Sequence, residues 1–173
     1  MRRAGGFTVT ELMVTIAVFA LLAAIAVPTL RNVMQNSRVR AAAASLQNGF
    51  AMARAEAVRL NTQVEFVVTA NGWSINRVSP NTLLQQASGK ERATGLTVTA
   101  TPGGADRITF NAFGRVVSVN PSNGSAPLTQ LNIAATNPLT TPDYRPLRVQ
   151  ILGGGLARVC DPAAASTEPK ACL

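Results

Sequence analysis

An apolar stretch near the N-terminus constrains this chain more than any other feature of its sequence. Residues Phe7 to Leu30 contain no lysine or arginine, and Glu11 is their only charged residue. At about 1.5 Å per residue, a helix of this length spans a hydrocarbon core of about 30 Å. The sequence therefore predicts a transmembrane helix over residues 7–30. Because Arg2 and Arg3 precede it, the positive-inside rule places the N-terminus in the cytoplasm and the remaining chain across the membrane.

Composition limits the chemistry that the rest of the chain can carry. With 173 residues, the chain has the size of one globular unit with an attachment. Histidine is absent and only eight carboxylates are present, which argues against His-dependent catalysis and His-ligated metal sites. We therefore expect no enzyme, no metal and no cofactor. Sixteen basic residues give a net charge of +8, which favours anionic partners.

A cleaved secretory signal is the alternative interpretation of the apolar stretch. Residues 24–26, Ala-Ile-Ala, resemble a small-residue cleavage site that follows an apolar region. The chain would then be an ordinary secreted binding protein that begins after Ala26. Glu11 argues against this, because a carboxylate inside a membrane segment costs up to about 3 kcal/mol and calls for a functional explanation.

Residues 6–11, GFTVTE, follow a short basic leader. This combination, with the apolar run and Pro28 downstream, resembles the class III signal of type IV pilins and type II secretion pseudopilins. The resemblance implies that residues 1–6 are a leader peptide. A prepilin peptidase would cut between Gly6 and Phe7 and methylate the new amine of Phe7. The apolar helix would stay on the mature chain and anchor it.

Glu11 and Pro28 are the residues to which the resemblance gives a role in assembly. The new α-amino cation of Phe7 is a partner for Glu11, and in this family the contact is made between subunits and selects the register of an incoming subunit. A local contact of Glu11 with its own helix N-terminus is the alternative. Pro28 lacks an amide proton, so we expect the helix to kink or loosen over residues 24–28.

A second helical pattern follows the apolar stretch over residues 31–60. These residues contain no proline and only Gly49 as glycine, and apolar residues recur every three or four positions. The predicted stripe consists of Val39, Ala43, Leu46, Phe50, Ala53, Ala57 and Leu60. Asn61 is expected to end the helix. Residues 46–68 resemble the signature of the H-type pseudopilins and the fimbrial T/U minor pilins, the GspH/FimT/FimU family.

Residues 61–173 have the pattern of a β-rich domain. Short β-prone runs are separated by Gly, Pro, Asn and Ser. The predicted strands cover residues 63–69, 72–78, 96–101, 107–110, 115–119, 128–134, 148–152 and 156–160. Trp73 is expected in the core, and Gly114 is expected in a tight turn. The predicted fold class is α+β and pilin-like, with a long N-terminal helix whose outer half packs on antiparallel β-sheet.

The glycines at 153–155 predict a hairpin turn close to the C-terminus. In that register Gln150 faces Arg158 and Arg148 faces Cys160, which brings the two arginines close together. With Arg145 nearby, they could contact a phosphate backbone. Fimbrial T-type proteins bind DNA through a C-terminal Gly-Arg-x-Arg element, but residues 155–158 here read Gly-Leu-Ala-Arg. A DNA role is therefore an alternative, and ordinary solvation or subunit contact is the simpler interpretation.

Cys160 and Cys172 are the only cysteines. In a domain that faces an oxidising compartment, they predict a disulfide that closes a loop near the C-terminus. The loop-entropy model gives such a bond a stabilising effect of about 3 kcal/mol.

Together these features predict a minor pilin or pseudopilin. The expected role is assembly into the initiation or tip complex of a type IV pilus, with a possible part in twitching motility or DNA uptake. An H-type pseudopilin of a type II secretion system and a DNA-binding minor pilin are the alternatives. The expected partners are other pilins, the assembly platform, prepilin peptidase and inner-membrane lipid. The expected location is the bacterial inner membrane, with a periplasmic domain, and then the pilus or pseudopilus.

Overall fold

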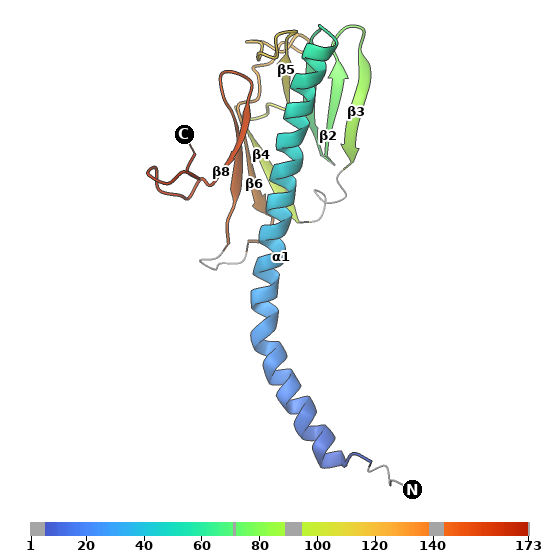
Figure 1. The fold of residues 1–173 in the computed structure, drawn as a ribbon, viewed down its shortest axis with the longest axis vertical. Helices are drawn as coiled ribbons and strands as arrows, with labels where there is room; N and C mark the ends of the chain where they lie inside the picture. The colour runs from blue at the N-terminus through green and yellow to red at the C-terminus, as the bar shows by residue number, and fades with distance from the viewer. Residues whose placement is uncertain (1–5, 71, 89–94, 139–143, 173) are drawn as a thin grey trace.

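One long helix and two small sheets make up the fold. The computed structural model describes residues 6–70, 72–88, 95–138 and 144–172. Helix α1 runs without interruption over Val9–Arg59, so the two predicted helical segments form one helix. Its N-terminal half stands apart from the domain and curves gently, and its C-terminal half packs on the sheets (Figure 1). The backbone stays helical through residue 28, and the local loosening expected there is not seen.

The length of α1 does not by itself make it a membrane-spanning helix. Among the residues that the structure describes, no helix is both long and apolar enough to cross a membrane. The transmembrane segment over residues 7–30 therefore stays a prediction from the sequence.

Within the described residues, eight strands pair in antiparallel fashion in two four-stranded sheets. The first sheet has the order β3-β2-β1-β5 and the second has the order β4-β6-β7-β8. The bounds are β1 Val64–Thr69, β2 Gly72–Arg77, β3 Thr82–Ser88, β4 Leu96–Thr101, β5 Arg107–Phe110, β6 Gln130–Ala135, β7 Leu147–Ile151 and β8 Ala157–Cys160. Both sheets lie behind the C-terminal half of α1 (Figure 1).

The core forms where the apolar stripe of α1 meets these sheets. Six of the seven predicted stripe residues are buried, and Leu60 is half-buried at the C-cap. The ring of Phe66 on β1 lies between Phe50 on α1 and Trp73 on β2, with centroid distances of 4.2 Å and 5.5 Å. Nε1 of Trp73 donates to Oγ of Ser45 at 3.2 Å. The expectation that Trp73 belongs to the core is confirmed.

Gly49 permits the close approach of α1 to this aromatic cluster. A Cβ atom at residue 49 would lie 2.5 Å from Cε2 of Phe66 and 3.0 Å from Cε2 of Trp73. Glycine in a helix interior normally costs about 1 kcal/mol relative to alanine. At this position that cost is offset by the tight packing that the missing Cβ allows.

Replacing Gly49 with alanine is expected to destabilise the fold by about 1–3 kcal/mol despite the better helix propensity of alanine, because the packed rings must shift. Chemical unfolding of the full chain, followed by the fluorescence of Trp73, measures the change. Asn48→Ala at the adjacent exposed position gives the propensity gain without the clash. A Gly49→Ala protein that is as stable as Asn48→Ala would contradict this account of the packing.

Two strand predictions differ from the structure. The strand predicted over residues 115–119 is wrong: these residues contribute an isolated bridge between Phe110 and Val116 before the chain turns into a loop that Asn120 holds. Strand β3 is not predicted by the sequence pattern. Its residues are mostly exposed at the sheet edge, so no apolar alternation marks it, and its pairing with β2 defines it. The other strands agree with the prediction to within two residues.

Candidate assembly site

The chain enters α1 through three non-helical residues, the last of which, Thr8, is extended. Gly6, Phe7 and Thr8 precede the first helical residue, Val9. Oγ1 of Thr8 accepts a hydrogen bond from the backbone N–H of Glu11 at 3.2 Å and caps the helix. Phe7 is 87% exposed. The peptide bond between Gly6 and Phe7 therefore lies outside the helix and next to an exposed side chain.

Glu11 lies in the first turn of α1 with its side chain exposed. A carboxylate is favoured at this position by the helix dipole and by the threonine cap three residues earlier. Among the residues that the structure describes, its carboxylate forms no ion pair. Glu11 can therefore interact with the N-terminus of its own helix within a single chain. Its contact with a second subunit stays a prediction.

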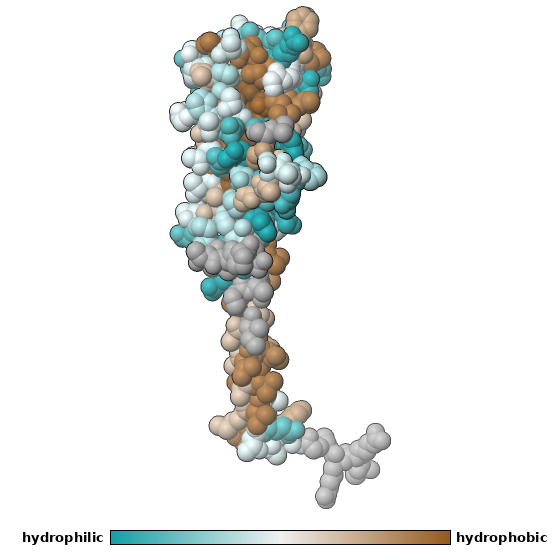
Figure 2. All heavy atoms as spheres, turned by 90° about the vertical axis from the view of Figure 1, so that its left-hand side faces the viewer, coloured by the Kyte–Doolittle hydropathy of each residue, from teal (hydrophilic) through white to brown (hydrophobic). Residues whose placement is uncertain are grey.

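The N-terminal half of α1 exposes a continuous apolar surface. Figure 2 shows this surface as a brown stalk below the more hydrophilic domain. The exposed large apolar residues include Leu12, Met13, Val14, Ile16, Val18, Phe19, Leu21 and Leu22. Soluble monomers rarely expose so many large apolar side chains together, so these residues favour an apolar environment such as lipid or the helices of other subunits.

The hairpin of β7 and β8 has the register that the sequence predicts. Arg148 faces Cys160, and Gln150 faces Arg158. Nε of Arg148 donates to Oδ1 of Asn132 on β6 at 2.6 Å. Arg148 and Arg158 are both half-buried residues. The hairpin therefore brings the two arginines to one face of the sheet, as expected.

The side chain of Arg158 binds the C-terminal loop. Its Nη2 donates to the carbonyls of Pro169 and Ala171 at 2.6 Å and 3.2 Å. The disulfide between Cys160 and Cys172 closes this loop, with a Cα–Cα distance of 5.1 Å, and confirms the predicted pairing. Arg158 thus holds its own chain, while the side chain of Arg145 is exposed. The predicted contact of these arginines with DNA is not tested by this arrangement.

An open apolar groove of about 670 Å³ runs between α1 and the tip of the β7–β8 hairpin. Two side chains of α1 position its walls: Nε of Arg54 donates to the carbonyl of Gly114 at 3.0 Å, and Nε2 of Gln47 donates to that of Ala157 at 3.1 Å. Gly114 has a φ of 70°, as its predicted tight turn requires. Val58 and Leu156 line the groove and are more than half exposed.

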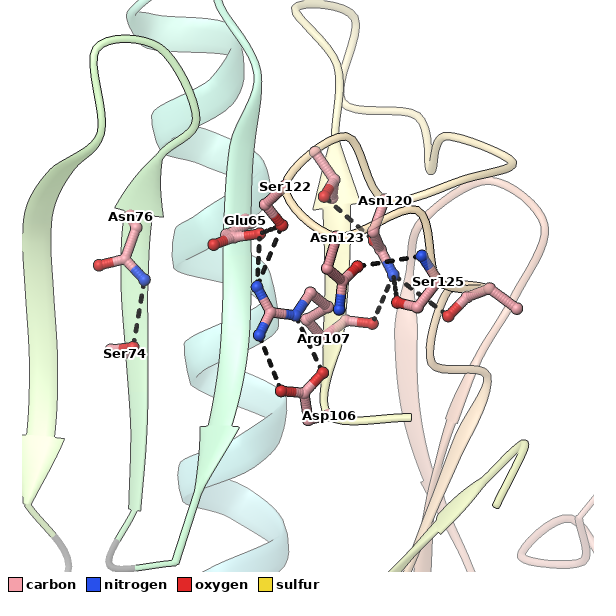
Figure 3. Close-up of polar contacts among 11 residues, drawn as sticks. Glu65, Ser74, Asn76, Asp106, Arg107, Asn120, Ser122, Asn123 and Ser125 are labelled. Atoms are coloured by element: carbon pink, nitrogen blue, oxygen red, sulfur yellow. Dashed lines mark hydrogen bonds and ion pairs between the residues drawn. The ribbon is translucent and has the colours of Figure 1, made fainter. Parts of the chain in front are cut away.

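A polar cluster behind the first sheet was not anticipated from the sequence (Figure 3). The guanidinium of Arg107 lies 2.9 Å from Oδ2 of Asp106 and 3.5 Å from Oε2 of Glu65. Ser122 donates to Glu65, which is buried on β1. The cluster ties the loop after residue 119 to the sheet. The one signal in the sequence is a glutamate within the apolar run of β1, a position that implies a buried partner.

The hydrogen bond from the Arg107 guanidinium holds the pKa of the Asp106 carboxyl below its ordinary value and raises the pKa of Arg107. An acid whose pKa is lowered in the folded state stabilises the fold above its unfolded pKa of about 3.9. This stabilisation is lost as the pH falls through the lower, folded pKa.

Asp106→Asn is therefore expected to lower stability at pH 7 by at most about 1 kcal/mol, because solvent screens a side chain that is 45% exposed. The difference from the original protein should shrink as the pH falls below about 4. Urea unfolding at pH 7 and at pH 3 measures both values. A difference that is equal at the two pH values would contradict the role assigned to this carboxylate.

Within the described residues, no group of three or more acidic, cysteine or histidine side chains is placed to hold a metal ion.

The free apolar half-helix, the helix packed on antiparallel sheet and the C-terminal disulfide define a pilin-like α+β protein. The sequence matches the family model of the type II transport protein GspH over residues 42–155. It also matches the prokaryotic N-terminal methylation motif over residues 1–27. Since the first match covers more than half of the chain, this chain belongs to the GspH family. The predicted resemblance is confirmed, and the chain has a pilin or pseudopilin role.

The fold is similar to two crystal structures of the type IV minor pilin FimU from Pseudomonas aeruginosa. In one crystal form the TM-score is 0.55 at 20% identity, over 79% of this chain and 96% of FimU. In the other it is 0.51 at 19% identity, over 78% of this chain and 99% of FimU. At this identity the likeness shows the shared fold. No curated protein matches the chain.

Proposed function

We propose that the chain is a minor subunit of the initiation or tip complex of a type IV pilus. The observation that carries this proposal is the apolar half of α1, which buries little within its own chain and follows directly on the non-helical residues 6–8. A peptidase that acts at this segment would leave the apolar half attached. The subunit would then be held in the inner membrane through residues 7–30, with a cytoplasmic N-terminus and a periplasmic domain over residues 61–173.

The partners follow from the same arrangement. Prepilin peptidase would act on residues 6 and 7, and other pilins would cover the apolar half of α1 when the subunit leaves the lipid. The assembly platform would receive the subunit before incorporation. The likeness to FimU in fold supports a minor-pilin role, because that relative is a type IV minor pilin.

An H-type pseudopilin of a type II secretion system is the second candidate, and the description of the matching family as a type II transport protein supports it. Deletion of the gene separates the two. Loss of surface pili with normal protein secretion supports the pilus subunit. Loss of secretion with normal piliation supports the pseudopilin.

The mature N-terminus tests what the two candidates share. Mass spectrometry of the protein purified from membranes is expected to show a chain that begins with N-methylated Phe7, because the Gly6–Phe7 bond lies outside the helix, which begins at Val9. A chain that begins after Ala26 would show instead that the apolar stretch is a secretory signal. In that case the protein would be a secreted binding protein.

A further inference from the structure

Exposed arginines surround α1 just beyond its apolar half. Arg31 follows Leu30, and Arg38 and Arg40 lie two to three turns further along the helix. All three arginines are exposed. Because each helical residue is rotated by about 100° from the previous one, Arg31 and Arg38 share one side of α1, whereas Arg40 lies on another. The positive charges therefore lie on two opposite sides of the helix.

A fourth arginine reaches the same level from the β domain. The backbone N–H of Arg145 donates to Oδ1 of Asn36 at 3.0 Å. Nε2 of Gln35 donates to the carbonyl of Asn137, also at 3.0 Å. These two bonds fix both ends of the connection from β6 to β7 beside one turn of α1. Arg145 is exposed there, close to the turn that carries Arg38 and Arg40.

These four residues form the basic collar. Its members are Arg31, Arg38, Arg40 and Arg145. In the part of the chain that the structure describes, none of them forms an ion pair with a carboxylate. The collar thus presents positive charge that its described surroundings do not neutralise.

A pocket in the collar is large enough for an oxyanion. Arg40 and Arg145 line an open pocket of about 350 Å³, which Asp161 and Lys170 also line. Oδ1 of Asp161 accepts a hydrogen bond from the backbone of the C-terminal loop, and this residue is buried. Lys170 is paired with Glu168 at 3.0 Å. Asp161 brings one negative charge to this lining, and Arg40, Arg145 and Lys170 bring three positive charges, so the lining is net positive.

The height of the collar corresponds to a headgroup layer. Asn36, which bonds to Arg145, lies less than two helical turns beyond Leu30, or about 9 Å along the axis. The headgroup region adds roughly 5–8 Å on each side of the hydrocarbon core, and charges act over a Debye length of about 8 Å. With the apolar half of α1 in a bilayer, flexible arginine side chains at this height reach the lipid phosphates.

We propose that the basic collar binds the phosphate groups of anionic phospholipids on the side of the membrane that carries the β domain. This inference rests on the proposed function, because it requires the apolar half of α1 to be in the bilayer. Guanidinium groups bind phosphate oxygens through paired hydrogen bonds. The collar holds the β domain against the membrane surface, and these contacts are released when the subunit moves into a filament.

Full-length protein reconstituted in bilayers tests the proposal. Mixed bilayers of phosphatidylcholine and phosphatidylglycerol are prepared with a spin-labelled form of either lipid, and electron paramagnetic resonance gives the relative association of each with the protein. We expect a preference for phosphatidylglycerol that weakens with salt and falls about fivefold for each collar arginine removed. The test variant is Arg38→Gln/Arg40→Gln/Arg145→Gln. The backbone bond of Arg145 to Asn36 does not depend on its side chain.

Arg115→Gln is the matched control. Arg115 is exposed and follows Gly114, which bonds to Arg54, a residue about 21 Å along α1 from Arg40, the nearest helix residue of the collar. The proposal is supported if the triple variant loses the preference and the control keeps it. Three outcomes overturn the proposal: the original protein shows no preference for phosphatidylglycerol, the triple variant keeps the preference, or the control loses it equally.

Two further measurements separate lipid binding by the collar from insertion of α1 alone and from binding of nucleic acid. Flotation with vesicles of phosphatidylcholine alone reports insertion of α1, and failure to float overturns the proposed membrane anchor together with the collar. Insertion of α1 without a preference for anionic lipid overturns lipid binding by the collar and leaves the proposed membrane anchor in place. The neutral vesicles are also tested for retention of duplex DNA. If the original protein retains DNA, the triple variant does not, and no lipid preference is found, the collar binds nucleic acid instead.

Discussion

Replacement of Glu11 with alanine is expected to leave cleavage between Gly6 and Phe7 intact and to block incorporation of the subunit. The carboxylate is exposed in the single chain, so its removal costs the isolated fold little. In an assembly it would be surrounded by apolar helices, where we expect it to pair with the N-terminal amine of a neighbour. Loss of one partner of a buried ion pair costs about 3 kcal/mol or more, which is at least a hundredfold in subunit affinity.

Thr8→Ala is the matched control for this experiment. It removes the cap of α1 and weakens the helix start by about 1 kcal/mol, but it keeps the carboxylate. Immunoblots of membranes and of sheared filaments measure processing and incorporation separately. If Thr8→Ala blocks incorporation as strongly as Glu11→Ala, the local role of Glu11 at its own helix explains the effect. Normal incorporation of Glu11→Ala would reject the assembly role.

The second large effect is expected from the disulfide. Cys160→Ser/Cys172→Ser is expected to lower the free energy of unfolding by about 3 kcal/mol, because the unfolded chain regains the freedom of the loop between the two residues. Residues 161–171 should then become sensitive to proteases. Urea unfolding and limited proteolysis of the full chain measure the two consequences.

Arg158→Ala separates the disulfide from the other contacts of the loop. This variant loses the two hydrogen bonds to the carbonyls of Pro169 and Ala171 but keeps the covalent link. Its expected cost is about 1–2 kcal/mol, in the range for bonds from a charged donor. If the double serine variant is no less stable than Arg158→Ala, the disulfide contributes less than the loop-entropy model requires.

The structure changes how the basic residues of the chain are interpreted. The sequence groups Arg145, Arg148 and Arg158 because they lie close together near the C-terminus. In the fold, Arg148 bonds to Asn132 and Arg158 bonds to the C-terminal loop. Arg145 instead lies beside α1, near arginines more than a hundred positions earlier in the chain. Spacing along a strand predicts which residues are neighbours on the sheet. It does not predict which arginines form hydrogen bonds with other parts of the chain.

Local patterns were sufficient for much of the fold. Three predictions that rest on short-range geometry are confirmed. They are the buried apolar stripe of α1, the register of the final hairpin and the disulfide. Strand β3 and residues 115–119 differ, because an edge strand and an isolated bridge depend on the partner strand more than on their own residues. The cluster of Glu65, Arg107 and Ser122 joins residues far apart in sequence, and no local period marks it.

The sequence alone determined the processing motif, the apolar half-helix, the buried stripe of α1 and the cysteine pair, because each is set by covalent order or by helical and strand periodicity. Only the tertiary structure decided which arginines are used internally, how closely α1 approaches Phe66 at Gly49, and which charges meet around the base of the domain. Those outcomes depend on contacts between distant segments, whose distances are fixed when the sheets pack on the helix.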